Sequence, residues 1–228
     1  MRRPQLIVFA KVPRPGFVKT RLTPPLSAEQ AALVYEAMLG DVLELTDAFA
    51  RDRGLERVLA FTPAEAVGAM LPRTPPGYRL QAQRGLGLAE RMANAFAECD
   101  AAGAPWALLR GSDSPGLGGE HLEEAIDRLE AGAELVLTPD SSGGYAMIGL
   151  REAQRMLFEL PMSNDELLAR TMDLAREQGL DVGVTRPTFD LDRVTDFVQL
   201  ESLPAEEASD RCPRTVQTIS ELRESGVL

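Results

Sequence analysis

Short apolar runs alternate along the chain with longer stretches in which apolar residues recur at helical spacing. This alternation of strand-length and helix-length segments favours an α/β protein with helices on both faces of one sheet. Seven of the short apolar runs are predicted to be strands: residues 6–10, 57–61, 79–83, 106–109, 135–138, 145–148 and 182–184.

The helices are predicted between these strands. The first is expected to begin at Ser27, because Ser27 and Gln30 have the spacing of a capping box, and to run towards Phe49. The remaining helices are expected at residues 88–99, 120–129, 165–177, 195–203 and 215–224.

Length and composition favour one domain. The chain has 228 residues, of which 44% are hydrophobic, and can bury one substantial core. Neither an internal repeat nor a Pro/Gly/Ser-rich linker divides it, so residues 1–228 are expected to form a single domain. The apolar runs are far shorter than the roughly 20 residues that span a bilayer, and the N-terminus does not resemble a signal peptide. We therefore expect a cytoplasmic protein without membrane insertion; the sequence indicates no oligomeric state.

The overall charge argues against one class of partner. A net charge of -11 and an isoelectric point near 4.7 disfavour a nucleic-acid partner, whose phosphates such a chain repels. Four cations nevertheless gather in the loop after the first strand: Lys11, Arg14, Lys19 and Arg21. Gly16 lies among them and would let backbone N–H groups approach an anion. The loop is predicted to bind phosphate; the alternative is a solvated basic loop paired with acidic neighbours.

Carboxylates are placed to complement that loop. Asp113 follows the apolar run 106–109 and precedes a Pro-Gly turn, which directs it towards the crevice where parallel sheets bind ligands. It is a candidate metal ligand, and the pair of loops suggests a polyphosphate held with Mg²⁺. Asp190 and Asp192 would share one face of an extended segment, and one of them could complete the metal site. The alternative there is a helix cap plus a solvated acid.

Two glycine-containing loops provide further candidates. Gly85 begins a loop that fails the dinucleotide fingerprint, but Gln83 and Gly85 could contact the base or sugar of a nucleotide; a plain connector is the alternative. The loop after the strand 135–138 is predicted to bind the acceptor, although a simple turn would use the same residue types. Its candidate residues are Asp140, Ser142, Gly143, Gly144 and Tyr145.

Four motifs in order carry a resemblance to a known family: residues 11–22 with 26–30, Gly111 to Leu117, Gly143 to Leu150, and Asp190-Leu191-Asp192. Across nearly the whole chain they resemble a bacterial GT-A-fold family labelled glycosyltransferase-like or radical-SAM/selenodomain-associated transferase. The N-terminal stretch is similar, less closely, to 2-phospho-lactate guanylyltransferases. The resemblance implies a three-layer α/β/α, Rossmann-like nucleotide-diphospho-sugar transferase fold with a mostly parallel mixed sheet. It also implies that Asp113 and Asp192 bind the metal.

Two departures from that family pattern fall on the acceptor side. Relatives commonly have an Asp directly before the paired glycines, where this chain has Ser142. They often have a Trp in the region that here reads Leu160 to Ser163, with Met162 in it. Both departures bear on the acceptor more than on the nucleotide.

The leading hypothesis is Mg²⁺- or Mn²⁺-dependent nucleotidyl transfer from a nucleoside triphosphate to a small, for example phosphorylated, acceptor. Lys19, Arg21 and Asp113 would be catalytic, with Lys11 helping to hold the distal phosphates. A phosphate acceptor would need no general base, which suits a chain whose single histidine, His121, is expected to be a surface or capping residue. The first alternative is a glycosyltransferase that uses a nucleotide sugar, with Asp140 as base. The second is a nucleotide-binding protein that has lost catalysis.

Overall fold

The computed structural model describes residues 2–162 and 165–228. Its centre is a seven-stranded sheet with the order β3-β2-β1-β4-β6-β5-β7. Strand β6 is antiparallel to β4 and β5, whereas the other neighbouring pairs are parallel. The strands are β1 Gln5–Lys11, β2 Glu56–Thr62, β3 Tyr78–Ala82, β4 Ala107–Gly111, β5 Leu135–Pro139, β6 Tyr145–Leu150 and β7 Val182–Val184. All seven predicted strands are present, and the predicted mostly parallel mixed sheet is confirmed.

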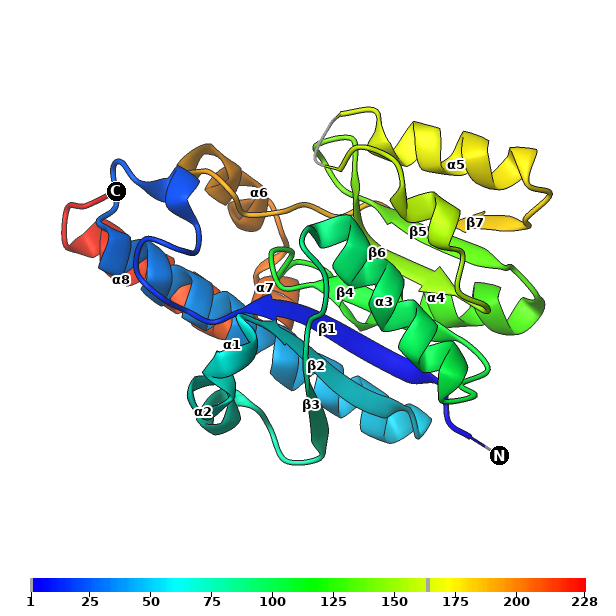
Figure 1. Cartoon of the computed structure of the whole chain (residues 1–228). Helices are drawn as coiled ribbons and strands as arrows, with labels where there is room; N and C mark the ends of the chain where they lie inside the picture. The colour runs from blue at the N-terminus through cyan, green and yellow to red at the C-terminus, as the bar shows by residue number, and fades with distance from the viewer. Residues whose placement is uncertain (1, 163–164) are drawn as a thin grey trace.

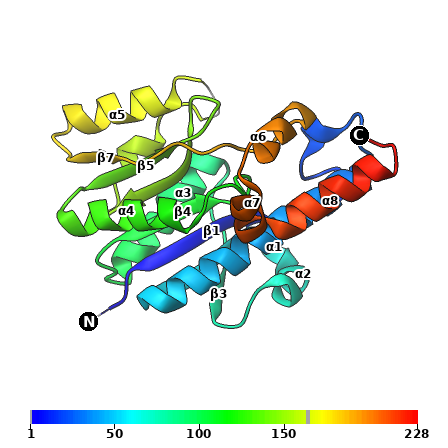
Figure 2. The ribbon, with the colours of Figure 1, turned by 180° about the vertical axis from the view of Figure 1, so that it is seen from behind.

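Helices cover both faces of the sheet (Figures 1 and 2). Residues of α3 and α5 pack against one face, and residues of α1 and α4 pack against the other. Helix α8 lies along the outer side of α1, where Asp41 accepts hydrogen bonds from the backbone N–H groups of Arg214 and Thr215. The helices are α1 Ala28–Arg53, α2 Val67–Met70, α3 Leu88–Ala101, α4 Gly119–Ala131, α5 Leu167–Glu177, α6 Phe197–Glu201, α7 Ala205–Arg211 and α8 Pro213–Glu224.

The first helix shows why these elements begin and end where they do. Both hydrogen bonds of the predicted capping box form between Ser27 and Gln30. The helix continues past Phe49 to Arg53 and ends at Gly54, whose φ of 68° is a left-handed conformation that glycine adopts without steric cost. The sequence prediction missed α2 and α7, and the helix expected at 195–203 is the shorter α6.

A long connection after β7 brings distant parts of the chain to the carboxyl ends of the strands. In Figure 1 it runs from β7 across the top of the sheet to α6. Its backbone is held by the N–H groups of Thr185 and Thr188, which donate to carbonyls of β5, and by the N–H of Leu191, which donates to the carbonyl of Asp113 after β4. This crossing segment, residues 185–193, delivers Asp190 and Asp192 to the loop that carries Asp113. No helix within the described ranges is long and apolar enough to cross a bilayer.

Candidate functional site

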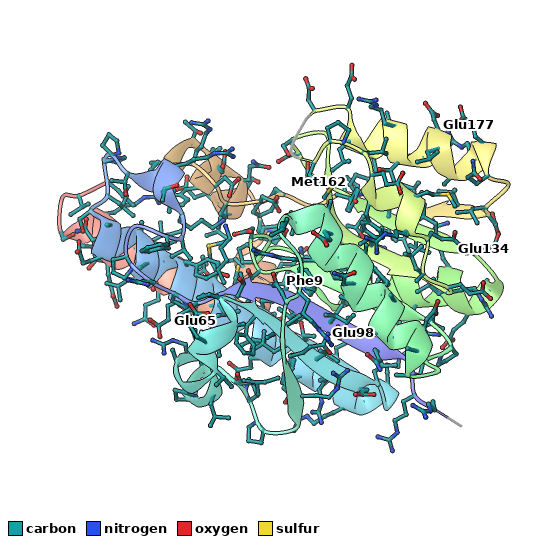
Figure 3. All side chains as sticks on the ribbon, viewed as in Figure 1. Phe9, Glu65, Glu98, Glu134, Met162 and Glu177 are labelled. Carbon is teal, nitrogen blue, oxygen red and sulfur yellow. The ribbon has the colours of Figure 1, made fainter. Side chains whose placement is uncertain are left out.

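The loops at the carboxyl ends of the strands enclose a cavity of about 760 Å³. Phe9 and Met162, both labelled in Figure 3, line it from β1 and from the segment before α5. The predicted site residues on its wall are Lys11, Lys19, Arg21, Gln83, Asp113, Asp140, Ser142, Gly144, Tyr145 and Asp192. A second hollow of about 560 Å³ lies at the opposite ends of β1, β2 and β3, and none of the predicted site residues line it.

The ammonium of Lys19 lies between two carboxylates in this cavity. Its Nζ is 2.5 Å from Oδ1 of Asp113 and 2.9 Å from Oδ1 of Asp192, and the side chain is only 3% exposed. Burial by itself lowers the pKa of Lys19, but the two carboxylates outweigh it and raise that pKa above its ordinary value. Lys19 is therefore a charged, buried cation shared by two acids that lie far apart in the sequence.

Arg21 completes the ion-pair cluster from the solvent side. Its Nη1 is 3.1 Å from Oδ2 of Asp192, so each oxygen of that carboxylate faces a cation. Burial raises the pKa of Asp192, whereas Lys19 and Arg21 lower it, and the net shift is downward. Asp192 is thus held in its ionised form.

The backbone of the basic loop is folded tightly to place Lys19. The residue has a φ of 46°, the left-handed region that a residue with a side chain rarely adopts. Such a conformation costs on the order of 1–3 kcal/mol and persists where surrounding contacts enforce it. Val18, Leu22 and Leu26 are buried on either side and anchor the loop to the core, while the two ion pairs fix the Lys19 side chain.

Direct contacts join the loop after β4 to the crossing segment. The N–H of Leu191 donates to the carbonyl of Asp113 at 3.0 Å, and Ser114 Oγ donates to the carboxylate of Asp190. Burial raises the pKa of Asp190 to about 6 although the Ser114 hydrogen bond opposes the shift.

Asp196 organises the turn that follows. Its carboxylate accepts hydrogen bonds from the backbone N–H groups of Asp192 and Arg193. Asp196 therefore shapes the backbone, whereas Asp190, which also lines the cavity, binds the Ser114 side chain and Asp192 contacts Lys19.

A buried arginine holds the loop that follows β4 and carries Asp113. Arg110 on β4 is fully buried, and its guanidinium donates to the carbonyls of Ser114 at 3.0 Å and Leu117 at 3.3 Å. Burial lowers the pKa of Arg110 to about 10. These bonds hold both ends of the turn that follows Asp113.

The second glycine-containing loop is organised by Asp140. Its Oδ1 accepts hydrogen bonds from the backbone N–H of Ser142 at 2.6 Å, from Ser142 Oγ at 2.8 Å and from the N–H of Gly144 at 3.0 Å. Gly143 does not line the cavity, contrary to its expected acceptor role. Its backbone packs against Asp165, so the space beside this glycine is already filled by the chain itself. The turn interpretation therefore explains Gly143, whereas Ser142 and Gly144 face the cavity.

Tyr145 follows that loop and has a polar group without a partner. Its hydroxyl is buried and forms no hydrogen bond with the described residues. Burial raises the pKa of Tyr145. A register shift between β5 and β6 at this point lets Tyr145 pack on the same side of the sheet as Ile148.

Several residues of the predicted phosphate site lie elsewhere. Arg14 stacks over the ring of Phe17 at 4.4 Å from its centroid and, like Gly16, is outside the cavity lining. Gly85 is also outside it, and its carbonyl accepts a hydrogen bond from Arg91 Nε. Gln83 does line the cavity, but its amide donates to the carbonyl of Ala60 at 2.7 Å. Of the cations predicted to bind phosphate, Lys11, Lys19 and Arg21 therefore line the cavity.

Tyr35 and Arg91 are among the residues of the cavity wall that sequence reasoning missed. Tyr35 of α1 is buried, and its hydroxyl bonds to Ser112 Oγ at 2.8 Å and accepts from the N–H of Lys11 at 2.9 Å. It ties the ends of β1 and β4 together, and nothing in the helical pattern singles it out. Arg91 lies in the first turns of α3 and donates to Thr62 Oγ1 at 3.3 Å. Its position just after the Gly85 loop is the sequence signal from which Arg91 could have been predicted.

His121 joins the two segments that carry the acids. Its Nδ1 accepts from the N–H of Gly118 at 3.2 Å, and in that tautomer Nε2 donates to the carbonyl of Pro187 at 3.3 Å. The sequence predicted a surface or capping residue; His121 does lie in the capping region of α4, but it is buried. Burial lowers the pKa of His121, and this effect outweighs the opposing effects of Pro187 and Glu120.

We expect this histidine to make the fold acid-sensitive. Because the pKa of His121 is lowered in the folded state, the unfolded chain binds a proton at a higher pH than the folded protein does. Stability should therefore fall as the pH drops below about 6.5. His121→Gln removes the only histidine-dependent titration of the chain. Urea unfolding at about pH 7.5 and pH 5 should therefore show a larger loss of stability for the wild type than for the variant. Equal losses in the two proteins would contradict a depressed pKa.

Solved structures share this fold over nearly the full chain. A candidate nucleotide-diphospho-sugar transferase from Desulfovibrio desulfuricans G20 has a TM-score of 0.88 at 24% identity, with 98% of this chain and 96% of that chain covered. A cytidylyltransferase from Leptospira borgpetersenii serovar Hardjo-bovis has a TM-score of 0.54 at 12% identity, covering 99% and 96%. A CMP:2-keto-3-deoxy-manno-octonic acid synthetase in complex with CTP has a TM-score of 0.54 at 12% identity, covering 90% and 100%. These likenesses confirm the predicted transferase-type α/β fold and, at such identities, establish the fold alone.

Sequence comparison places the chain in a family. No curated protein matches it. Residues 45–164 match the family described as "Uncharacterized protein conserved in bacteria (DUF2064)". The matched region contains β2 to β6 and the loops of Asp113 and Asp140, whereas Lys19 and Asp192 lie outside it. Because the match covers more than half of the chain, the protein belongs to the DUF2064 family of bacterial proteins.

Proposed function

We propose that this protein is a transferase that acts on a nucleotide-activated donor with the help of Mg²⁺ or Mn²⁺, and that it transfers a nucleotidyl group from a nucleoside triphosphate to a small acceptor. The observation that carries the proposal is the Lys19 ammonium held by Asp113 and Asp192 in the cavity at the strand ends. Ligands of doubly wound sheets bind at such strand ends. The fold is shared with a cytidylyltransferase and with a synthetase solved with CTP, which supports a nucleotide as the ligand.

The donor atoms fit a hard divalent cation. Asp113 and Asp192 present oxygens close enough to contact the same cation, since the ammonium of Lys19 touches both. Over residues 2–162 and 165–228, no group of three or more His, Cys, Asp or Glu is arranged to hold a metal. Two carboxylates suffice for Mg²⁺, which usually keeps waters and takes its other ligands from substrate phosphates. When bound, the ion would neutralise charge on those phosphates.

The protein's own cations supply the remaining charge. Lys11, Lys19 and Arg21 line the cavity and would bind the β and γ phosphates, where negative charge accumulates as pyrophosphate leaves. An acceptor oxygen would attack the α phosphorus while the bond to the β phosphate breaks. A phosphate acceptor is already an anion and gives up no proton, so this reaction needs no general base.

Glycosyl transfer from a nucleotide sugar is the second candidate. The high structural similarity to a candidate nucleotide-diphospho-sugar transferase favours it. Asp140 lines the cavity and would be the base for an acceptor hydroxyl, but three hydrogen bonds within its own loop already occupy its Oδ1. We therefore rank nucleotidyl transfer first.

Product analysis separates these reactions. Purified protein with Mg²⁺ is incubated with each nucleoside triphosphate or nucleotide sugar and with sets of sugar phosphates, phosphorylated acids and free sugars. Acceptor-dependent pyrophosphate release is expected; release of nucleoside diphosphate would instead support the glycosyltransferase. Calorimetric binding of a nucleotide without turnover would identify a nucleotide-binding protein that has lost catalysis, and neither binding nor turnover would refute the proposal. Omitting Mg²⁺ and adding a chelator provides the control for metal dependence.

A further inference from the structure

The chain contains only two lysines, and both line the cavity. They are Lys11 and Lys19, whereas every other basic residue apart from His121 is an arginine. Arginine is the usual choice for a fixed ion pair, because its planar fork binds a carboxylate through two parallel hydrogen bonds. A lysine between two carboxylates therefore calls for a property that arginine lacks.

The ammonium group is a compact point charge on a flexible stem. In this cavity it contacts one oxygen from each of Asp113 and Asp192 at 2.5 and 2.9 Å. A divalent cation that used both acids would need the same position. A planar guanidinium has a different shape: Arg21 contacts only the outer oxygen of Asp192 and lies largely exposed.

We propose that Lys19 is a tethered substitute for the metal ion, occupying the position between Asp113 and Asp192 until a bound polyphosphate draws the ammonium away and a divalent cation replaces it. This inference rests on the proposed function, because it assigns to the same site a binding order for metal and donor. Metal alone binds the protein weakly. Metal and polyphosphate strengthen each other's binding by the same factor, as thermodynamic linkage requires.

Electrostatics makes the two cations mutually exclusive. A divalent ion between the acids would lie against the Lys19 ammonium, and like charges at that separation repel strongly because the Lys19 side chain is only 3% exposed and is little screened by water. Without any cation, the two carboxylates would face each other unneutralised, which is also unfavourable. The ammonium relieves this repulsion in the free protein, and the phosphates of a donor provide the anion towards which the ammonium can move.

The first test measures Mg²⁺ binding by calorimetry in the absence of any nucleotide. Lys19→Met should bind Mg²⁺ at least about 10-fold more tightly than the wild type, a change of ~1.4 kcal/mol. Lys11→Met is the matched control, because it removes the same charge from the same cavity but leaves the ammonium between the acids in place; its gain should be clearly smaller. Equal Mg²⁺ affinity in Lys19→Met and the wild type, or an equal gain in the two variants, would overturn the proposal.

A second measurement uses the wild type and does not depend on the folding of a variant. Amine-selective labelling with mass spectrometry distinguishes Lys19 from Lys11 by their peptides. Raising Mg²⁺ at constant ionic strength should speed labelling of Lys19 relative to Lys11, since each bound ion releases the buried ammonium. A constant ratio of the two labelling rates through the titration would contradict the exchange.

These outcomes are independent of turnover. If Lys19→Met gains Mg²⁺ affinity but the protein transfers nothing from any nucleotide, the exchange stands and the proposed function fails. If nucleotide-dependent turnover is found while Mg²⁺ affinity is the same in both proteins, the function stands and the exchange is wrong.

Discussion

Replacing Asp113 by Asn is expected to lower metal-dependent turnover by about 100-fold or more, the size of effect seen when a charge contact made in a transition state is lost. The substitution retains the shape of the side chain but removes the negative charge that would attract a divalent cation. It also leaves Lys19 with Asp192 as its one remaining carboxylate partner among the described contacts. Steady-state pyrophosphate release measures the first effect, and calorimetry with Mg²⁺ and a non-hydrolysable triphosphate measures the accompanying loss of binding.

A matched control separates this effect from a general change in charge. Asp173 on α5 is 71% exposed and pairs only with the nearby Arg176 among the contacts described. Asp173→Asn removes the same charge and should retain turnover close to that of the wild type, because an exposed pair contributes little. Turnover of Asp113→Asn equal to that of Asp173→Asn would rule out Asp113 as a metal ligand. Thermal melting of both variants shows whether the fold is intact.

The strands could be predicted from sequence because each is a short apolar run with its own local signal. Asp113 could also be placed in advance, since it lies two residues after the end of β4 and the carboxyl ends of parallel strands lie at the same edge of a sheet. The antiparallel direction of β6 has no such signal. It depends on how β6 pairs with β4 and β5, contacts that no local pattern contains.

The contacts within the site were harder to predict from the sequence, because they too join residues that lie far apart in the chain. Lys19 and Asp192 are separated by 173 positions, and their contact requires the crossing segment to be fixed by backbone bonds such as that from Leu191 to Asp113. Charge type alone suggested that Lys19 binds phosphate and Asp113 binds metal. That these two side chains bind each other in the free protein follows only from the three-dimensional fold. Tyr35 was missed because a buried aromatic residue on a helix normally serves the core.

Replacing Gly143 by Ala is expected to lower the free energy of unfolding by roughly 3 kcal/mol or more, combining overpacking with backbone strain. A Cβ at this position would lie 2.1 Å from the carbonyl oxygen of Asp165, and backbone cannot swing aside as a flexible side chain can. The φ of Gly143 is 89°, so the new side chain would be strained even without that contact. Because Leu168 donates to the Gly143 carbonyl, the start of α5 and the cavity wall beside it should be disturbed as well.

Gly179→Ala isolates the steric part of this cost. Gly179 has a φ of 76°, close to that of Gly143, but an added Cβ there would meet no atom within 4 Å. Its substitution should cost only the strain of a left-handed residue, about 1 kcal/mol. The difference between the two variants in chemical denaturation therefore measures how tightly Asp165 packs on Gly143. Equal losses would show that the loop moves away freely, in which case Gly143 is required only for its backbone conformation and leaves room for an acceptor.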